Sequence, residues 1–450
     1  MSPTHSLEKR RVPDIIARSV PDAITASAIL TLVMAGVAAV MGNPLSRIAD
    51  AYQQGLWMLL QFTMQMTLVI VLSSALSVTP YFRKGITALA RLPRTPKQIV
   101  ILAFLVSGTA SYLFWGLGYA LGPLIAILFA ADAERRGIPI DFPFLLGVTY
   151  AAQALWQYGL SSSGPLLIAT QGHFLQNIIG VVPLHTTIWS PAALIHEVAY
   201  AAAAIFVACR FLPKLSRPVS HYPDAFALTK ALETAKANTS GLSIAQRLEV
   251  RPGANIVIVL LLAGWLFTHY FVKRLGYDIN TLNTTLLLLV FLLYGSVKQF
   301  GQAIERSVGK GWAVIVLYHL YGGVAGLVQF TNVGERVSAF AASISNASTF
   351  PLITALVGTV FACFIPSSGG QFAVQGFVTV KSALAVGVSF QRGILALGVG
   401  DHMGNFVTPF WYLVVAAIAR VDFRSFFGYG FLFAGIWFTI GVLVFTFAPC

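Results

Sequence analysis

Apolar stretches long enough to cross a lipid bilayer recur along the whole chain. The plainest of them cover 23–42, 55–78, 190–209, 254–272, 281–297, 311–330 and 426–447. A helix needs about 20 mainly apolar residues to span the hydrocarbon core. With 57% hydrophobic and 10% charged residues, the 450-residue chain has too few polar groups to cover a soluble globule. The sequence therefore predicts an all-α polytopic membrane protein.

The basic residues are concentrated in a few connecting segments. Of 29 Lys and Arg residues, 23 fall in six segments: 1–22, 79–97, 132–142, 210–252, 298–310 and 420–425. If these segments are cytoplasmic, the chain obeys the positive-inside rule, and its net charge of +13 requires no nucleic-acid partner. This assignment predicts a multi-pass membrane protein with a cytoplasmic N-terminus. It requires that 98–131 and 350–383 enter the bilayer and return to the side from which they came.

Two similar halves follow from this pattern. Each re-entrant hairpin (98–131 and 350–383) precedes an apolar stretch that is broken near its middle (143–170 and 388–418). Because the hairpins enter from opposite sides, the halves form an inverted structural repeat, which is typical of secondary transporters. The predicted parts are an N-terminal arm (1–22), a first transmembrane repeat (23–209), a cytoplasmic linker (210–252) and a second transmembrane repeat (253–450). Alignment of Pro165 with Pro409 places Gln157 opposite Asp401.

The stretch "PSSGGQFAVQG" (366–376) puts helix-breaking residues at bilayer depth. Non-helical backbone is tolerated there only where protein or a water-filled cavity satisfies its polar groups. A Ser- and Gly-rich tip that faces a cavity could bind a carboxylate through backbone amides at a helix N-terminus. The candidate substrate-binding residues of this tip are Ser367, Ser368, Gly369, Gly370, Gln371 and Gln375. The alternatives are a simple tight turn and, for the two glutamines, hydrogen bonds to neighbouring backbone.

The broken helices offer oxygen ligands for a small cation. Asp401 is the most distinctive residue, because a carboxylate in an apolar stretch is costly and usually functional; a structural pair with His402 or Arg392 is the alternative. The other candidates for cation coupling are Asn405, Thr408, Ser161, Gln157, Gly116 and Gly118, with Na⁺ placed near Asp401, Asn405 and Thr408. Further candidates for substrate binding are Ser162, Ser163, Gly164 and His402. Helix kinking is the alternative for the Ser-Gly-Pro run.

Three stretches resemble the bacterial short-chain fatty acid transporter family of AtoE-type carriers: "PSSGGQFAVQG" (366–376), "GDHMGNFVTPFW" (400–411) and "WQYGLSSSGP" (156–165). The resemblance implies uptake of short monocarboxylates, such as acetoacetate or butyrate, by a cation-coupled carrier of the ion-transporter superfamily. It also implies a bacterial inner membrane as the location and a homodimer with an elevator-type mobile unit that carries the hairpins. This chain has Gln371 where family members have His, and Asp401 where they have Glu.

Other functions find less support in the sequence. No HExxH or GxSxG motif is present, and a Ser367–His402 dyad has no third group to orient it, so an intramembrane enzyme is not expected. No ring of charges or filter motif suggests a channel. A di- or tricarboxylate carrier would need extra positive charge at the tips, which contain no Lys or Arg. No cofactor is expected beyond Na⁺ as a possible coupling ion, with H⁺ as the alternative coupling ion, and the three cysteines are expected as buried free thiols.

Overall fold

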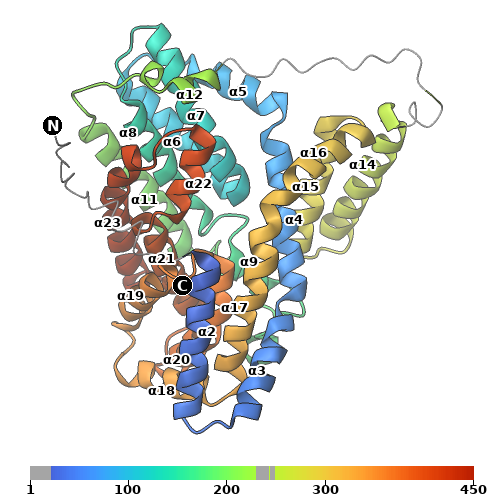
Figure 1. The fold of residues 1–450 in the computed structure, drawn as a ribbon, viewed down its shortest axis with the longest axis vertical. Coiled ribbons are helices and arrows are strands. Elements are labelled where there is room, and N and C mark those ends of the chain that lie inside the picture. The colour runs from blue at the N-terminus through green and yellow to red at the C-terminus, as the bar shows by residue number, and fades with distance from the viewer. Residues whose placement is uncertain (1–21, 230–242, 244–248, 450) are drawn as a thin grey trace, which may run out of the picture.

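The computed structural model describes residues 22–229, 243 and 249–449. The described chain is helical throughout, which confirms the prediction of an all-α polytopic fold (Figure 1). Eight helices are long and apolar enough to cross a membrane, and the bent pair α21–α22 would be a ninth. Most of the N-terminal arm, part of the predicted linker and Cys450 lie outside the described residues. Cys209 and Cys363 are free thiols that are half-buried.

The first half begins with three long helices and ends with one. Its helices are α2 (Ala23–Val40), α3 (Leu45–Met58), α4 (Leu60–Ser77), α5 (Pro80–Ala90), α6 (Pro96–Leu113), α7 (Trp115–Arg135), α8 (Phe142–Ala152), the 3₁₀ turn η1 (Gln153–Trp156), α9 (Ser163–Ala169), α10 (Gln176–Ile179), η2 (Leu184–Thr186) and α11 (Pro191–Arg210). The described part of the linker contains η3 (Val219–His221) and α12 (Pro223–Ala227).

The second half has a comparable order of elements. Its helices are α14 (Pro252–Phe267), the π-helical η4 (Thr268–Val272), α15 (Ile279–Tyr294), α16 (Val297–Val308), η5 (Gly309–Gly311), α17 (Trp312–Phe330), α18 (Val333–Ser343), α19 (Phe350–Ala362), α20 (Ser368–Ala385), α21 (Phe390–Val407), α22 (Phe410–Ala419) and α23 (Arg424–Phe447). The inverted relation between the halves and the domain boundaries stay predictions.

Helices α6 and α7 form an antiparallel hairpin with its tip at Phe114. Thr95 caps α6, Pro96 begins it, and the extended backbone of Phe114 ends it. A Cβ on Gly118 would lie 2.6 Å from the Cα of Ser111, and one on Gly122 would lie 3.4 Å from the Oγ of Ser107, so the two helices run in opposite directions in close contact. Each helix is long enough to span a membrane, so the re-entrant character of this hairpin stays a prediction.

Helix α19 packs closely against α21 before the chain turns into α20. Gly400 and Gly404 lie one turn apart on α21 and face α19, where a Cβ would lie 2.2 Å from the Ala355 carbonyl oxygen and 2.2 Å from the Ala362 Cβ, respectively. Only glycine permits this approach. Asp401 follows Gly400 on this closely packed helix and is buried in the interior of the protein.

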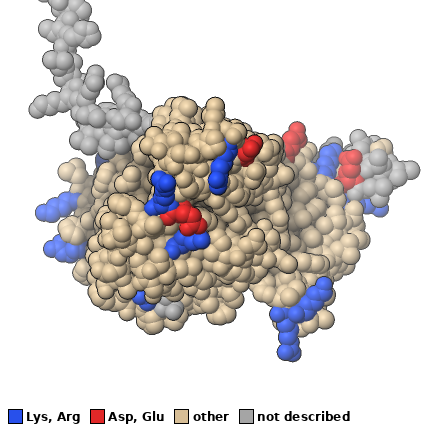
Figure 2. Space-filling view, turned by 90° about the horizontal axis from the view of Figure 1, so that it is seen from below, with Lys and Arg blue, Asp and Glu red and all other residues tan. Residues whose placement is uncertain are grey.

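Two groups of helices are visible in Figure 1. One contains α6–α8, α11, α19 and α21–α23, and the other contains α3, α4 and α14–α16; α2, α9, α17 and α20 lie near where the groups meet. Helices α5 and α12, from two of the segments expected to be cytoplasmic, lie at the upper end. The lower end, seen in Figure 2, is mostly uncharged, with scattered Lys, Arg, Asp and Glu side chains.

Candidate functional site

Four irregular segments meet in the interior of the protein. The backbone N–H of Trp115, at the first hairpin tip, donates to the Ser161 hydroxyl over 2.8 Å. Trp411, which follows the break in the second broken helix, donates its indole N–H to the Pro366 carbonyl at the second hairpin tip. Its ring also contacts the Trp115 ring, with a centroid distance of 6.1 Å. Both tips therefore meet both broken helices at one place.

The second hairpin tip begins α20 with a capping serine. The Ser367 hydroxyl accepts from the Gly370 N–H over 3.4 Å and lies 3.1 Å from the Tyr318 hydroxyl of α17. The Ser368 hydroxyl accepts from the Gln157 side-chain amide over 3.4 Å. Ser368 is only partly buried, so its hydroxyl is the group of this tip that is best placed to contact a ligand.

The expectation that the tip glycines face an open cavity is wrong. A Cβ on Gly369 would lie 2.6 Å from the Tyr318 hydroxyl, and a Cβ on Gly370 would lie 2.5 Å from the Tyr321 ring. Both glycines are buried. Their role in this structure is to let the start of α20 approach α17, which leaves Ser367 and Ser368 as the partly buried residues of the tip.

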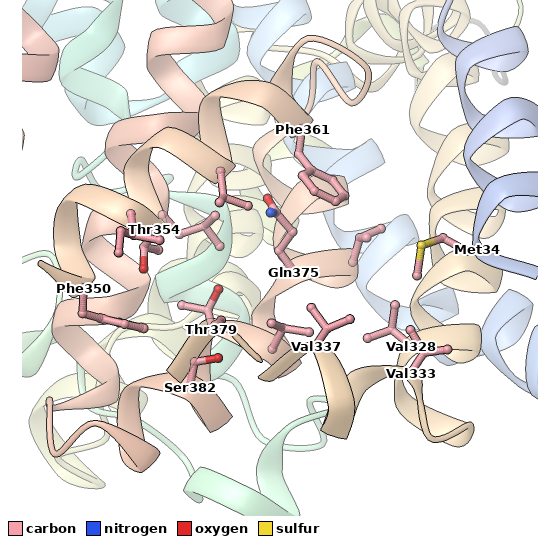
Figure 3. A pocket seen from close by; sticks show the side chains of 16 residues that line it. Met34, Val328, Val333, Val337, Phe350, Thr354, Phe361, Gln375, Thr379 and Ser382 are labelled. Atoms are coloured by element: carbon pink, nitrogen blue, oxygen red, sulfur yellow. The ribbon is translucent and has the colours of Figure 1, made fainter. Parts of the chain in front are cut away.

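The two glutamines of α20 hydrogen-bond within the protein. The Gln371 amide donates to the Gly358 carbonyl over 2.8 Å and to the Gln375 side-chain oxygen over 2.7 Å. Gln375 lines a mainly apolar cavity of about 170 Å³ (Figure 3). Helices α2, α17, α18, α19, α20 and α21 contribute side chains to that cavity. These contacts match the alternative in which the glutamines satisfy neighbouring polar groups.

Asp401 lies in the interior on α21, with 2% of its surface exposed. Ser368 and Gln157 are its polar neighbours. Among the described residues, neither carboxylate oxygen of Asp401 has a hydrogen-bond partner, and the same is true of the Gln157 oxygen and of both amide atoms of Asn405. Asn405 lies one helical turn after Asp401, on the same face of α21. Buried polar atoms without partners are rare, so their concentration here indicates a ligand or ion.

The unpartnered oxygens suit Na⁺ better than a transition metal. Carboxylate, amide and hydroxyl oxygens are hard ligands. In the described part of the chain, no group of three or more His, Cys, Asp and Glu side chains could hold a metal ion. Thr408 lies nearby at the break, where its hydroxyl donates to the Gly404 carbonyl over 2.9 Å. The residues that could hold Na⁺ are thus Asp401, Gln157, Asn405 and Ser368.

The Ser-Gly-Pro run closes the break in the first broken helix. The chain is non-helical between η1 and α9, and the Ser162 hydroxyl donates to the Gln157 carbonyl across this gap over 2.5 Å. Ser163 begins α9, and Gly164 packs against the Phe372 ring of α20, with its Cβ position 3.1 Å from that ring. Ser162 and Gly164 hold the break in shape, whereas Gln157 and Ser161 contact the hairpin tips.

Three predicted residues lie outside this cluster of polar atoms. His402 faces an aromatic region, where its ring centroid lies 4.9 Å from Trp437 and 4.8 Å from Phe406. Gly118 packs against α6 and the Gln153 side chain, and Gly116 packs against Ser73 of α4, with a Cβ position 3.0 Å from the Ser73 Cβ. At the first tip, the contacting group is the Trp115 N–H, which the sequence analysis missed.

Sequence reasoning also missed two ionisable residues of α11, His196 and Glu197. Both are buried, with 0% and 6% of their surfaces exposed. The signal was present, because "LIHEVAY" (194–200) places a His-Glu pair inside an apolar stretch of spanning length. Aromatic residues around the tips were missed as well, including Tyr119, whose ring stacks on Trp411 at 4.4 Å.

Comparisons with known proteins agree on a transporter. The family model described as "Short chain fatty acid transporter" matches residues 7–446. A protein of Escherichia coli (strain K12) named "Putative short-chain fatty acid transporter" is 28% identical over 435 residues, which cover 96% of this chain and 97% of that protein. A protein of the same name from Haemophilus influenzae is 26% identical and covers 85% of this chain and 86% of its own length.

Solved transporter structures share the fold. The YdaH transporter of Alcanivorax borkumensis aligns with a TM-score of 0.59 and 14% identity, over 95% of this chain and 98% of its own. MtrF of Neisseria gonorrhoeae, described as a member of a class of antimetabolite efflux pumps, aligns with a TM-score of 0.55 and 15% identity, over 96% of each chain. At these identities the likeness shows the fold alone.

Proposed function

Because the chain belongs to the short-chain fatty acid transporter family, we propose that it takes up short monocarboxylates, such as acetoacetate or butyrate, together with a cation. The observation that carries this proposal is the cluster of unpartnered buried atoms on Gln157, Asp401 and Asn405, next to the partly exposed hydroxyl of Ser368. Substrate and coupling ion would occupy adjacent places between the hairpin tips. The family and the relatives are transporters, and an enzymatic role is not supported.

The anion site would consist of the Ser368 hydroxyl and the first turn of α20. The N–H groups of a first helical turn have no partners within the helix, and the helix dipole favours a negative charge there. Trp115, Tyr119 and Trp411 supply apolar ring surface beside the tips for a short alkyl chain. One helix terminus and one hydroxyl suit a single carboxylate, which favours a monocarboxylate over a di- or tricarboxylate.

The cation site would be built around Asp401. An unpaired carboxylate at membrane depth is costly, and a bound Na⁺ or a proton would relieve that cost. Gln157 and Asn405 offer further oxygens for Na⁺. A monocarboxylate that moves with one monovalent cation transfers no net charge, so the membrane potential neither drives nor opposes its transport. Na⁺ and H⁺ are both candidates for the coupling ion.

The proposal extends to the assembly and the membrane. We place the protein in a bacterial inner membrane with the basic segments in the cytoplasm, as a homodimer in which the hairpin-carrying helices move as an elevator-type unit. The packing of each hairpin against the broken helix of its own half, α6 and α7 against α8 and α19 and α20 against α21, supports such a unit. MtrF shares this fold and is described with efflux pumps, so direction is a separate question from fold.

Proteoliposomes with imposed gradients would test the function. Radiolabelled butyrate and acetoacetate should accumulate above their external concentration when a Na⁺ or H⁺ gradient is directed inward, and the rate should saturate with substrate concentration. Excess unlabelled short monocarboxylates should compete, whereas succinate and citrate should not. Accumulation of succinate or citrate in place of butyrate would favour the di- or tricarboxylate alternative. Flux that never exceeds equilibrium would contradict a coupled carrier.

A further inference from the structure

Helix α11 carries a buried ionisable pair that the proposed transport cycle does not use. The His196 Nδ1 lies 4.0 Å from the Glu197 Oε1. Within the described residues, neither oxygen of the Glu197 carboxylate and neither nitrogen of the His196 ring has a hydrogen-bond partner. No described Lys or Arg side chain forms an ion pair with Glu197. A buried carboxylate in a spanning helix is thus left beside one imidazole, which is charged only if it is protonated.

Aromatic rings surround the His196 imidazole. The His196 ring lies 4.4 Å from the Trp437 ring of α23, 5.1 Å from the Tyr158 ring and 5.5 Å from the Phe445 ring, measured between centroids. The Trp437 carbonyl also faces His196. This wall keeps water and other ligands away from the imidazole side of the pair.

Few other titratable groups face the pair. Tyr112 of α6 and Tyr200 of α11 are close enough to respond to the charge of Glu197. The Tyr200 hydroxyl already donates to the Ala151 carbonyl of α8. From α21, His402 is the titratable group that acts on His196, and α23 presents aromatic rings. None of these groups brings a fixed positive charge to Glu197.

The surroundings of Glu197 suit a proton better than a metal cation. A bare carboxylate at this depth costs several kcal/mol unless it is paired or neutralised. A metal cation would need several oxygen ligands, whereas the walls here are rings, and no described cluster of three His, Cys, Asp and Glu side chains exists. A proton needs only one carboxylate oxygen. We propose that Glu197, beside His196, is a second cation-binding site of this protein and that its ligand is a proton.

Glu197 is not fully enclosed. It keeps 6% of its surface exposed, and Tyr112, which is close enough to respond to its charge, is half-buried. From this side a Glu197 oxygen would take a proton from hydronium, forming one O–H bond as one O–H bond of the hydronium breaks, and would return the proton to water when the hairpin-carrying helices change position. Since α11 lies among those helices in Figure 1, the proton would move with them.

This site goes beyond the proposed function, which requires one cation at Asp401. It predicts that transport depends on pH even if Na⁺ is the ion that binds at Asp401. Failure of the proposed function would appear as an absence of coupled uptake in the wild type. Failure of this inference would appear in Glu197 variants of a protein that does transport, and in a spectrum that needs no transport at all.

The direct test is pH-difference infrared spectroscopy of the purified full-length protein in lipid. The wild type should show a protonated-carboxyl band that depends on pH, and Glu197→Gln should lose a component of it that Asp401→Asn retains. Glu335→Gln is the matched control, because Glu335 is an exposed partner of Lys381. If Glu197→Gln keeps the full band of the wild type, Glu197 binds no proton in this range and the inference is overturned.

The second test is the pH profile of substrate uptake in proteoliposomes. Glu197→Gln should flatten the profile, whereas Glu197→Asp, which keeps a titratable carboxylate, should restore pH dependence with a shifted midpoint. Should the Gln variant fail to fold, the Asp variant and its infrared band carry the test alone. A wild-type profile in Glu197→Gln, or a Glu197→Asp protein whose band and profile both match the wild type without any shift, would count against the inference.

Discussion

The side-chain amide of Gln157 donates to the Ser368 hydroxyl over 3.4 Å, which joins the broken helix of the first half to the hairpin tip of the second. These residues are 211 positions apart in the chain. Asp401 is a neighbour of both, and alignment of Pro165 with Pro409 places it opposite Gln157. Equivalent positions of the two broken helices therefore meet at the same tip. In the proposed function, a substrate at Ser368 and a cation at Asp401 would share this boundary, so each would affect the binding of the other.

The first prediction concerns Asp401→Asn. The amide keeps the shape of the side chain but cannot carry the negative charge, so we expect substrate binding to persist while gradient-driven accumulation is lost. Each uncompensated charge moved across the membrane is worth about 2.3 kcal/mol per 100 mV. Binding and accumulation of radiolabelled butyrate would be measured in the same preparation, with the exposed Asp50→Asn as control. Accumulation with unchanged cation dependence would exclude Asp401 as the coupling residue, and Ser161 would become the better candidate.

The second prediction concerns Ser368→Ala. Loss of one hydroxyl hydrogen bond to a substrate carboxylate should cost about 1 kcal/mol, which is roughly a fivefold loss of affinity. The fold should persist, because Ser368 is partly exposed and does not cap α20. Equilibrium binding of radiolabelled butyrate would show the effect, and Ser348→Ala, in an exposed loop, is the matched control. Wild-type affinity in Ser368→Ala would remove this hydroxyl from the substrate site.

The sequence predicted the membrane class and the family because both depend on local patterns. Apolar length identifies spanning helices, and "PSSGGQFAVQG" with "GDHMGNFVTPFW" carries the resemblance. Asp401 was identified for a similar reason, since a carboxylate stands out in an apolar stretch whatever surrounds it.

The residues that the sequence analysis misassigned or missed are ones whose surroundings depend on tertiary contacts. Whether Gly370 faces a cavity or the Tyr321 ring is decided by α17, which lies far from it in the chain. Gln371 likewise has a partner, the Gly358 carbonyl, that only the packing of α19 supplies. Glu197 was missed although a rule on buried charge applied to it, because the sequence analysis concentrated on breaks in helices and α11 has none.

The third prediction concerns Gly370→Ala. The new Cβ would lie 2.5 Å from the buried Tyr321 ring, and overpacking of this kind costs about 1–3 kcal/mol. We therefore expect a lower thermal unfolding midpoint in detergent, with near-normal substrate affinity in the protein that remains folded. Gly36→Ala is the control, because nothing lies within 4 Å of its Cβ position. A normal unfolding midpoint combined with lost affinity would show instead that Gly370 faces the ligand.

The last prediction concerns the ion pair between Arg217 and Asp141. The Arg217 Nε lies 2.7 Å from one carboxylate oxygen of Asp141 and its Nη2 lies 2.9 Å from the other, so the pair is bidentate. The hydrogen bond to Asp141 raises the pKa of the Arg217 guanidinium above its ordinary value, so the arginine is charged at every working pH. Asp141 also caps α8 by accepting from the Phe144 N–H. The pair thus holds the chain after α11 against the start of the first broken helix.

Substitution of Arg217 and substitution of Asp141 should lower the stability of the protein by different amounts. The Asp141 side chain is 1% exposed, so Arg217→Gln leaves a buried charge without its partner, whereas Asp141→Asn keeps an oxygen that can cap α8. Because Arg217 is 43% exposed, solvent screening limits the expected loss of stability in Arg217→Gln to about 1 kcal/mol.

Thermal unfolding of both single variants and the double variant would measure the coupling between Arg217 and Asp141, with Lys381→Gln, from an exposed pair, as control. The double variant should be less destabilised than the sum of the single variants, since the remaining charge is removed as well. Strict additivity would mean that the pair contributes nothing specific to holding α8 in place.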